Sequence, residues 1–365
     1  MTNFEEALRT DIRRRLENDE YRYSDNSPLY VVHGDTSALE KDANYLAALN
    51  VPSFETFTQH RRAFIDGIIN RYAYLYDLLA DANSREELTT RASYEVLGHV
   101  FVKFPCYRAG YHKKIQTVRE RTRIGELADF PCEEQLDLCD LTGLGYDFTC
   151  YIPTDGLFSL AYDAPYTYSH GQTLIAPAKG DVILDCGSGY CDTAFFFAFK
   201  TGLTGKVYSF EPNPLMRGIG LRNLQRNGKY ARRIVLLGFG VSDAVSENAR
   251  MVMQSVRSAL AGEDAAQGTV AEIRTTTIDH EVSHRRIPKV DFIKMDIEGA
   301  ELTALRGAAE TIRRFRPKLA ICVYHKPEDL VEIPRFITSL NAGYAFYLKH
   351  HSPVLNETVL YAKAE

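Results

Sequence analysis

The sequence feature that most constrains the fold is a change of pattern near residue 180. Beyond this point, short apolar segments with strand character alternate with helical segments. The first strands are predicted at residues 181–185 and 207–210, and the helices that follow them at residues 194–200 and 214–227. Such alternation is typical of parallel strands that are covered by helices on both faces of a sheet. The second half of the chain is therefore predicted to form a doubly wound α/β sheet.

The same pattern continues to the end of the chain. We predict further strands at residues 234–237, 290–295, 317–323, 344–349 and 358–362, with helices around residues 300–305 and 327–340. Only a short loop separates the last two strands, so one of them is expected to run antiparallel to its neighbours.

The first half of the chain lacks this alternation and is predicted to be mainly helical. Apolar residues recur at three-and-four spacing between residues 53 and 81, and Ser84 with Glu87 has the form of a capping box that would start a helix over residues 85–103. Because 365 residues exceed what one hydrophobic core usually serves, we predict two domains, at residues 1–165 and 166–365. The first is interpreted as an accessory or substrate-binding domain.

Composition and charge narrow the classes of partner. The net charge of −5 gives no general attraction to phosphate backbones or anionic lipids, so nucleic acid is not expected as a partner. Seven cysteines without a CxxC pair argue against a disulfide framework and a zinc site, which fits a reducing cytoplasm. No stretch approaches the roughly 18 apolar residues of a membrane span, so neither membrane spanning nor export is expected.

A glycine-containing turn follows the first strand of the second half. In the segment DVILDCGSGYCD (181–192), an apolar strand ends at Asp185 and leads directly into Gly187 and Gly189. Glycines let the backbone approach a ligand closely, and the next helix presents its amide groups to the same place. We predict that this turn binds a ligand, although a tight turn without a ligand would have the same pattern.

The next strand ends in Glu211, within VYSFEPNP, about 20 residues after the second glycine. A carboxylate at this spacing binds ribose hydroxyls in both dinucleotide and adenosylmethionine proteins. The dinucleotide fingerprint needs a third small residue where this chain has Asp192, and Asp185 and Asp192 would both repel a pyrophosphate. The pattern favours a methyl donor with a cationic amine and a sulfonium over NAD. An NAD-dependent oxidoreductase and a non-catalytic module on the same fold stay as alternatives.

A cluster of acidic residues follows the strand at residues 290–295. In VDFIKMDIEGAEL, Asp296, Glu298 and Glu301 surround a glycine at the carboxyl end of the strand, which is where open α/β sheets bind ligands. Crowded carboxylates raise one another's pKa, so one of them is a candidate proton acceptor. Glu301 also suits the first turn of a helix, which is its simpler interpretation. Lys294 is expected to be a salt-bridge partner.

One strand further on, ICVYHKPEDL brings His325 to the same edge of the sheet. A histidine at a strand end can accept a proton, although single histidines are more often structural. His350 and His351 lie in the loop before the last predicted strand and are weaker candidates.

Four segments together resemble the successive motifs of FkbM-type methyltransferases: DVILDCGSGYCDTAFFFA, VYSFEPNP, VDFIKMDIEGAELTALRGA and LAICVYHKPEDL. The stretch KMDIEGAE is the most specific. The resemblance covers the second half of the chain, and LYDLLADANSREEL in the first half is similar to the helical extension of longer members. Members often read GANIGD where this chain has GSGYCD, so the packing against Tyr190 is expected to differ.

The resemblance implies a class I methyltransferase fold, which is Rossmann-like, and an enzyme that uses S-adenosyl-L-methionine to methylate a hydroxyl of a sugar, glycan or secondary metabolite. It places the donor's methionine end over the glycine turn, its ribose on Glu211 and its adenine near residues 240–243. The donor-binding residues that it implies are Asp185, Gly187, Gly189, Asp192, Glu211 and Asp243.

The resemblance also implies that Asp296 and Glu298 face the methyl acceptor, a small molecule or a glycan. Asp296, Glu298 and His325 are then the candidate catalytic bases. Alternatively, the carboxylates and a histidine hold Mg²⁺ or another oxygen-preferring divalent ion that lowers the pKa of the acceptor hydroxyl. The sequence leaves both mechanisms open, together with the identity of the acceptor and the oligomeric state.

Overall fold

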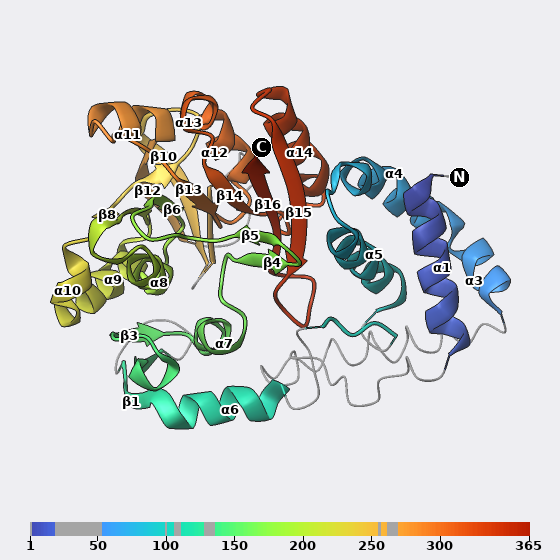
Figure 1. Cartoon of the computed structure of the whole chain (residues 1–365), viewed down its shortest axis with the longest axis horizontal. Coiled ribbons are helices and arrows are strands. Elements are labelled where there is room, and N and C mark those ends of the chain that lie inside the picture. Colours follow the sequence, from blue (N-terminus) through green and yellow to red (C-terminus); the bar gives the residue numbers. More distant parts are fainter. Residues whose placement is uncertain are drawn as a thin grey trace. The chain divides into compact units, whose positions relative to one another are not determined.

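The computed structural model describes residues 2–18, 53–98, 101–105, 111–127, 136–254, 257–260 and 269–365. The chain divides into two compact units, and Figure 1 labels their helices and strands. The first unit comprises Met1–Arg108 with Ser352–Asn356, and the second comprises Ala109–His351 with Glu357–Glu365. The unit that contains the main sheet thus begins at Ala109, whereas the change in sequence pattern predicts a boundary near residue 165. The separate folding of residues 166–365 stays a prediction.

The described part of the first unit is helical. Phe4 packs edge-on against Tyr72, and both side chains are fully buried. The predicted capping box is wrong, because Asp81 rather than Ser84 caps the last helix and accepts a hydrogen bond from the Ser84 amide at 2.8 Å. Aspartate caps a helix as well as serine does, so this helix begins at Ala82. The helices are α1 (Asn3–Glu17), α3 (Phe54–His60), α4 (Arg62–Leu78) and α5 (Ala82–Leu97).

The second unit is built on a seven-stranded sheet with the order β15-β16-β14-β13-β6-β7-β8. Five neighbouring strands of this sheet, β14, β13, β6, β7 and β8, run parallel to one another. Strand β16 runs antiparallel to both β14 and β15, which confirms the antiparallel pairing expected at the end of the chain. The strands are β6 (Val182–Cys186), β7 (Lys206–Phe210), β8 (Ile234–Leu237), β13 (Phe292–Met295), β14 (Lys318–Cys322), β15 (Tyr344–His350) and β16 (Thr358–Ala364).

The strand order brings the predicted site segments together. From β6 the chain continues to β7 and β8 on one side of the sheet and then crosses to β13 and β14 on the other. Open α/β sheets bind ligands at the carboxyl ends of the strands beside such a reversal. Helices cover both faces of the sheet (Figure 1), namely α8 (Asp192–Thr201), α9 (Pro214–Arg226), α10 (Gly228–Ala231), α11 (Ile278–His284), α12 (Glu301–Arg306), α13 (Ala309–Phe315) and α14 (Asp329–Ser339).

A small antiparallel sheet, which the sequence does not predict, docks on α9. Asn223 of α9 and Asn227, the C-cap residue of this helix, pair with the backbone of β3, an edge strand of the small sheet. Asn223 Oδ1 accepts from the Tyr151 amide at 2.8 Å, and Asn227 Oδ1 accepts from the Thr149 amide at 3.0 Å. The elements of this region are α6 (Tyr111–Thr122), β1 (Arg123–Glu126), β2 (Asp137–Asp140), β3 (Thr149–Ile152), α7 (Thr154–Tyr162), and the hairpin of β4 (Tyr168–His170) and β5 (Thr173–Ile175).

Another sheet that the sequence does not predict is inserted between β8 and β13. Its order is β11-β10-β12-β9, and β9 pairs in parallel with β12. This pairing ties the inserted sheet to the loop that follows β8. Its strands are β9 (Gly240–Val241), β10 (Ser246–Gln254), β11 (Arg257–Leu260) and β12 (Thr269–Thr276).

Two expectations from composition concern cysteines and membrane spanning. Within the described ranges, no helix combines the length and the apolar character needed to cross a bilayer. Five cysteines are buried free thiols, at positions 139, 150, 186, 191 and 322. Cys106 and Cys132 lie outside the described residues.

Candidate active site

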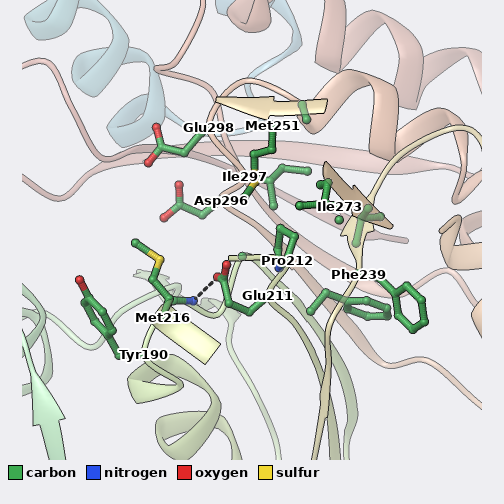
Figure 2. A pocket seen from close by; sticks show the side chains of 16 residues that line it. Tyr190, Glu211, Pro212, Met216, Phe239, Met251, Ile273, Asp296, Ile297 and Glu298 are labelled. Atoms are coloured by element: carbon green, nitrogen blue, oxygen red, sulfur yellow. Dashed lines mark hydrogen bonds between the residues drawn. The ribbon is translucent and has the colours of Figure 1, made fainter. Parts of the chain in front are cut away.

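A cavity of about 210 Å³ is lined by residues that directly follow β6, β7 and β13 (Figure 2). This is the reversal of strand order at which the fold predicts ligand binding. Its wall combines the backbone of the glycine turn, three carboxylates and an apolar side. The lining residues are Gly187, Gly189, Tyr190, Phe210, Glu211, Pro212, Met216, Phe239, Gly240, Val241, Met251, Ile273, Asp296, Ile297, Glu298 and Ala300.

The turn after β6 requires glycine at its first predicted position. Gly187 has a φ of +80°, and a Cβ there would lie 1.8 Å from the carbonyl oxygen of Asp296. The turn and the loop after β13 therefore meet backbone to backbone. Gly189 has a φ of +50° with open space where a side chain would be, and its amide donates to Glu211 Oε2 at 2.8 Å. Both glycines line the cavity, and their contact with a ligand stays a prediction.

Glu211 directly follows β7 and lines the cavity, with only 5% of its surface exposed. Its Oε2 accepts the Gly189 amide and its Oε1 accepts the Asn213 amide, each at 2.8 Å (Figure 2 shows the carboxylate). Burial raises the pKa of Glu211 from 4.5 to about 7, although the two amides act to lower it. Each carboxylate oxygen can accept a second hydrogen bond, as ribose binding requires.

Asp185 supports the glycine turn and does not line the cavity. It is fully buried, and its Oδ1 pairs with Lys294 Nζ at 3.3 Å. Its Oδ2 accepts the hydroxyls of Thr193 at 3.0 Å and Ser209 at 2.9 Å. Lys294 also donates to the carbonyl of Gly187. The predicted salt bridge of Lys294 is therefore confirmed, and it links β13 to the turn after β6.

Two other predicted donor-binding carboxylates also lie outside the cavity lining. Asp192 is in the first turn of α8, and its Oδ2 would lie 3.0 Å from a Cβ placed on Gly156 of α7. Asp243 is exposed in the segment after β9. The cavity is instead lined in this region by Gly240 and Val241 of β9.

Asp296 follows β13 and brings a carboxylate to the cavity. The Tyr166 hydroxyl donates to its Oδ2 at 2.8 Å, and the Tyr324 hydroxyl donates to its Oδ1 at 3.2 Å. Burial acts to raise the pKa of Asp296, but the charges of Lys294 and His325 and the two hydroxyls outweigh it and hold the pKa below its usual range. Asp296 is thus an ionised hydrogen-bond acceptor and not the carboxyl of raised pKa that crowding predicts.

His325 lies between three carboxylates that follow β13 in the sequence. Its Nε2 is 3.5 Å from both Asp296 Oδ1 and Glu298 Oε2, and its Nδ1 is 3.0 Å from Glu301 Oε1. Burial acts to lower the pKa of His325, but the carboxylates, Glu301 foremost, outweigh it and raise the pKa to about 9. In this arrangement the imidazole carries a proton at neutral pH.

Glu298 and Glu301 hold different positions around this histidine. Glu298 lines the cavity and has a φ of +54°, which residues other than glycine rarely adopt. In Figure 2 its carboxylate projects to the same side as that of Asp296. Glu301 begins α12, is fully buried, and accepts the Ile297 amide at 2.8 Å. The simpler interpretation of Glu301, as a helix-start residue, is therefore confirmed.

His350 and His351 make contacts away from the cavity lining. His350 Nδ1 lies 2.8 Å from the Thr358 hydroxyl. His351 Nδ1 contacts the carboxylate of Asp163, and its Nε2 lies 2.8 Å from the Tyr361 hydroxyl. These contacts tie β15 to β16 and to the end of α7, so both histidines have structural partners.

The apolar side of the cavity and the partners of Asp296 were not predicted. Met251 of β10 and Ile273 of β12 reach the lining from the inserted sheet, and Phe239 precedes β9 (Figure 2). Tyr324 adjoins His325, so the strand-end histidine is a signal that could have found it. Tyr166 lies 130 residues before the carboxylate that it binds, and no motif marks it.

The small sheet of β1–β3 supports another part of the cavity wall. Tyr190 and Met216 line the cavity and pack with Tyr151 of β3 in one buried apolar cluster. Asn223 joins the two regions, because its Nδ2 donates to the carbonyls of Tyr151 at 3.1 Å and Tyr190 at 2.9 Å. The glycine turn is therefore held from β3 and α9 as well as from β13.

The cavity is acidic and offers no basic side chain. Glu211, Asp296 and Glu298 line it, and none of the sixteen lining residues is Lys, Arg or His. Such a lining favours a ligand that carries positive charge and disfavours a pyrophosphate. Beside the cavity, Asp296, Glu301 and His325 each offer a potential metal-ligand atom within 4.8 Å of the others.

Comparison with known proteins identifies the domain that contains this cavity. Residues 179–346 match the family model of the methyltransferase FkbM domain. No curated protein matches the chain. Among solved structures, the chain is similar to methyltransferase FkbM from Methylobacillus flagellatus KT, with 22% identity and a TM-score of 0.51 over 82% of this chain and 60% of that one. This chain thus spans less than two thirds of that protein's length.

Two other solved structures are more distant. Fibrillarin from Aeropyrum pernix in complex with natively bound S-adenosyl-L-methionine is 15% identical, with a TM-score of 0.32 over 51% of this chain and 68% of that one. A SAM-dependent methyltransferase from Aquifex aeolicus is 17% identical, with a TM-score of 0.31 over 52% of this chain and 86% of that one.

Residues 179–346, a little under half of the chain, are thus identified as a methyltransferase FkbM domain. The predicted family and the predicted class I methyltransferase fold are therefore confirmed for this part of the chain. The similarity of the first half to the helical extension of longer members stays a prediction.

Proposed function

We propose that this chain, through its FkbM methyltransferase domain, transfers a methyl group from S-adenosyl-L-methionine to a hydroxyl of a sugar, glycan or secondary metabolite. The main support is that one cavity joins Glu211 and the glycine turn to Asp296 and Glu298. The first group suits the nucleoside of the donor. The second lies where an acceptor would meet the methyl group.

The donor is proposed to occupy the cavity in three parts. Its ribose hydroxyls donate to the two oxygens of Glu211, each of which already holds one backbone amide. Its adenine lies against the apolar side formed by Phe239, Val241 and Ile273. Its methionine end lies over the turn at residues 187–189, where the open space beside Gly189 leaves room for it.

None of the three predicted donor-binding residues Asp185, Asp192 and Asp243 lines the cavity, so this proposal gives the first two an indirect role and the third no role. Asp185 positions the turn through its pair with Lys294. Asp192 packs at the start of α8 beside Gly156. Asp243 is exposed and receives no role in donor binding.

Methyl transfer is an in-line displacement, in which the acceptor oxygen bonds to the methyl carbon while the carbon–sulfur bond breaks. The bonding electron pair stays on sulfur, which becomes a neutral thioether, and the hydroxyl proton leaves to a base. Holding the acceptor in line supplies most of the acceleration. Asp296, fixed by two tyrosine hydroxyls, would orient the acceptor hydroxyl, and Glu298 would accept its proton. Without a bound ion, His325 is protonated at neutral pH and would hold the two carboxylates in place.

Calorimetric titration of the purified chain tests the donor assignment. S-adenosyl-L-methionine and its demethylated product are expected to bind with a stoichiometry of one, and NAD is expected to give no heat. An absence of heat with the methyl donor, or equal binding of NAD, would contradict the proposal. The acidic lining is the reason for the expected discrimination.

Transfer of a labelled methyl group tests the reaction itself. The enzyme and labelled donor are incubated with glycosides and polyhydroxylated metabolites, and methylated products are identified by mass spectrometry. Label on a hydroxyl oxygen supports the O-methyltransferase. Donor binding without transfer to any hydroxyl compound would favour the non-catalytic module, and label on nitrogen or carbon would contradict the oxygen specificity.

A further inference from the structure

Four ionisable side chains meet beside the cavity with unbalanced charge. Asp296, Glu298 and Glu301 bring carboxylate oxygens to within 3.5 Å of the single imidazole of His325. Three carboxylates thus surround one imidazole, which can carry at most a single positive charge. The cluster therefore keeps a net negative charge, which attracts cations at the edge of the cavity.

Buried polar atoms in this cluster lack hydrogen-bond partners among the described residues. These atoms are Nε2 of His325 and Oε2 of Glu301. The side chain of His325 is only 8% exposed, and that of Glu301 is fully buried. Buried polar groups nearly always have a partner in the protein, a water molecule or an ion. The ring of His325 and the carboxylates around it are thus suited to hold an ion.

We propose that Asp296, Glu298 and His325 bind a divalent first-row cation of the Mn²⁺ type, with Glu301 as the second partner of the imidazole. Nε2 of His325 faces the two carboxylates that line the cavity, at 3.5 Å from each, whereas Nδ1 faces Glu301 at 3.0 Å. Metal-binding histidines usually donate their other ring N–H to a carboxylate, which fixes the orientation of the ring. The cluster has this arrangement.

The ligand set also selects the class of ion. Mg²⁺ prefers six oxygen ligands, whereas an imidazole with carboxylates suits Mn²⁺, Fe²⁺ or Zn²⁺. The sequence left open Mg²⁺ or another oxygen-preferring divalent ion, and the imidazole among the proposed ligands favours Mn²⁺, Fe²⁺ or Zn²⁺ over Mg²⁺. The hydroxyls of Tyr166 and Tyr324 hold the carboxylate of Asp296, so this ligand needs little reorganisation.

Binding of the ion does not rest on the proposed function, but its role does. When bound, a divalent cation at this place would lower the pKa of the acceptor hydroxyl. The residues of the chain would keep their positions, with Asp296 and Glu298 facing the cavity and Glu301 fixing the ring of His325.

Titration of the full, donor-free chain with Mn²⁺, followed by electron paramagnetic resonance, tests this site. One bound Mn²⁺ per chain is expected, and its spin echo should show modulation from one nitrogen, the Nε2 of His325. Glu298→Gln, at a partly exposed position, should weaken binding at least tenfold, and Glu301→Gln should weaken it about 10- to 100-fold through the ring orientation. Glu332→Gln, which alters a half-exposed carboxylate of α14 that pairs with Arg335, is the matched control and should not change the affinity for Mn²⁺.

Three results would overturn the site: no stoichiometric Mn²⁺, no nitrogen modulation, or wild-type affinity in the Glu298→Gln chain. The nitrogen signal is measured on the unaltered protein, so it does not depend on whether a variant folds. Donor binding is measured separately without metal. A chain that binds the donor but no Mn²⁺ would refute this site alone, and a chain that binds Mn²⁺ but no donor would refute the proposed function alone.

Discussion

Replacing Glu211 with glutamine should weaken donor binding by about 100-fold. Both carboxylate oxygens accept a backbone amide at 2.8 Å, one from Gly189 and one from Asn213. Glutamine has one carbonyl oxygen and an NH₂ group in place of the two carboxylate oxygens. One ribose hydroxyl therefore loses its acceptor, and the other keeps an acceptor that no longer carries a charge. A hydrogen bond to a charged group contributes about 1.5 kcal/mol or more, and a loss of about 3 kcal/mol corresponds to about 100-fold in Kd.

Calorimetric titration with S-adenosyl-L-methionine measures this effect, at about pH 8 so that the wild-type carboxylate is ionised. Glu211→Ala should also weaken the affinity for S-adenosyl-L-methionine at least about tenfold, since it removes both acceptors. Glu332→Gln, at a half-exposed position of α14, controls for the change of net charge. Thermal unfolding shows whether each variant is folded. A folded Glu211→Gln chain whose Kd stays within about threefold of wild type would refute the ribose assignment.

Four further outcomes follow from the same geometry. Burial raises the pKa of Glu211 to about 7, so this carboxylate becomes protonated as the pH falls from about 8 to about 6. The affinity for methylthioadenosine, which lacks the amino-acid group, should therefore fall about tenfold over this range, and the affinity of the Glu211→Gln chain should not change. A wild-type affinity that does not vary with pH would contradict an ionised acceptor at this position. Gly187→Ala should lower the Tm strongly, because the new Cβ would overlap the carbonyl oxygen of Asp296. Gly189→Ala places its Cβ in open space and should lower the free energy of unfolding by only about 1–2 kcal/mol. Equal losses of stability in thermal melts of the two variants would contradict the contact between Gly187 and Asp296. Asp296→Asn should keep the donor Kd within about threefold while lowering turnover roughly 100-fold, and equal effects on both would place Asp296 in donor binding instead. Isolated residues 166–365 should bind the donor, as the sequence predicts, but should melt at a lower temperature than residues 109–365, because they lack the strand that pairs with Asn223 and Asn227; identical melting curves would argue against that support.

The parts of the site that were predicted from the sequence have local signals. Gly187 and Glu211 each follow a buried strand directly, and the carboxyl ends of parallel strands meet at one edge of the sheet. The same reasoning predicted that Asp296 and His325, which follow two further strands, lie at this edge. In the structure, Nε2 of His325 is 3.5 Å from Oδ1 of Asp296. Short strands with unbroken apolar runs and helices between them are enough for this prediction.

Asp185 shows where a motif alone falls short. Successive side chains of a strand point to opposite faces, so a carboxylate at the end of β6 can point into the ligand site or into the layer beside it. Its partner Lys294 comes from β13, which pairs with β6 at this position. Only the pairing of the two strands shows that this carboxylate is neutralised inside the protein.

The apolar side of the cavity depends on long-range contacts that no local pattern encodes. Met251 and Ile273 come from strands rich in polar residues, which lack the apolar run of a buried parallel strand. Tyr166 reaches Asp296 from a segment with no helix or strand pattern of its own. The predicted capping box failed for a different reason, because Asp81 offered an equally good cap three residues before Ser84.

A crystal structure of the chain with S-adenosyl-L-homocysteine, the demethylated donor, tests most directly whether this cavity is the site of methyl transfer. We expect ribose hydroxyls within hydrogen-bond distance of both Glu211 oxygens, adenine against Phe239 and Ile273, and the sulfur directed toward Asp296 and Glu298. Ribose bound away from Glu211, or a sulfur directed away from the two carboxylates, would contradict the assignment of this cavity as the methyl-transfer site.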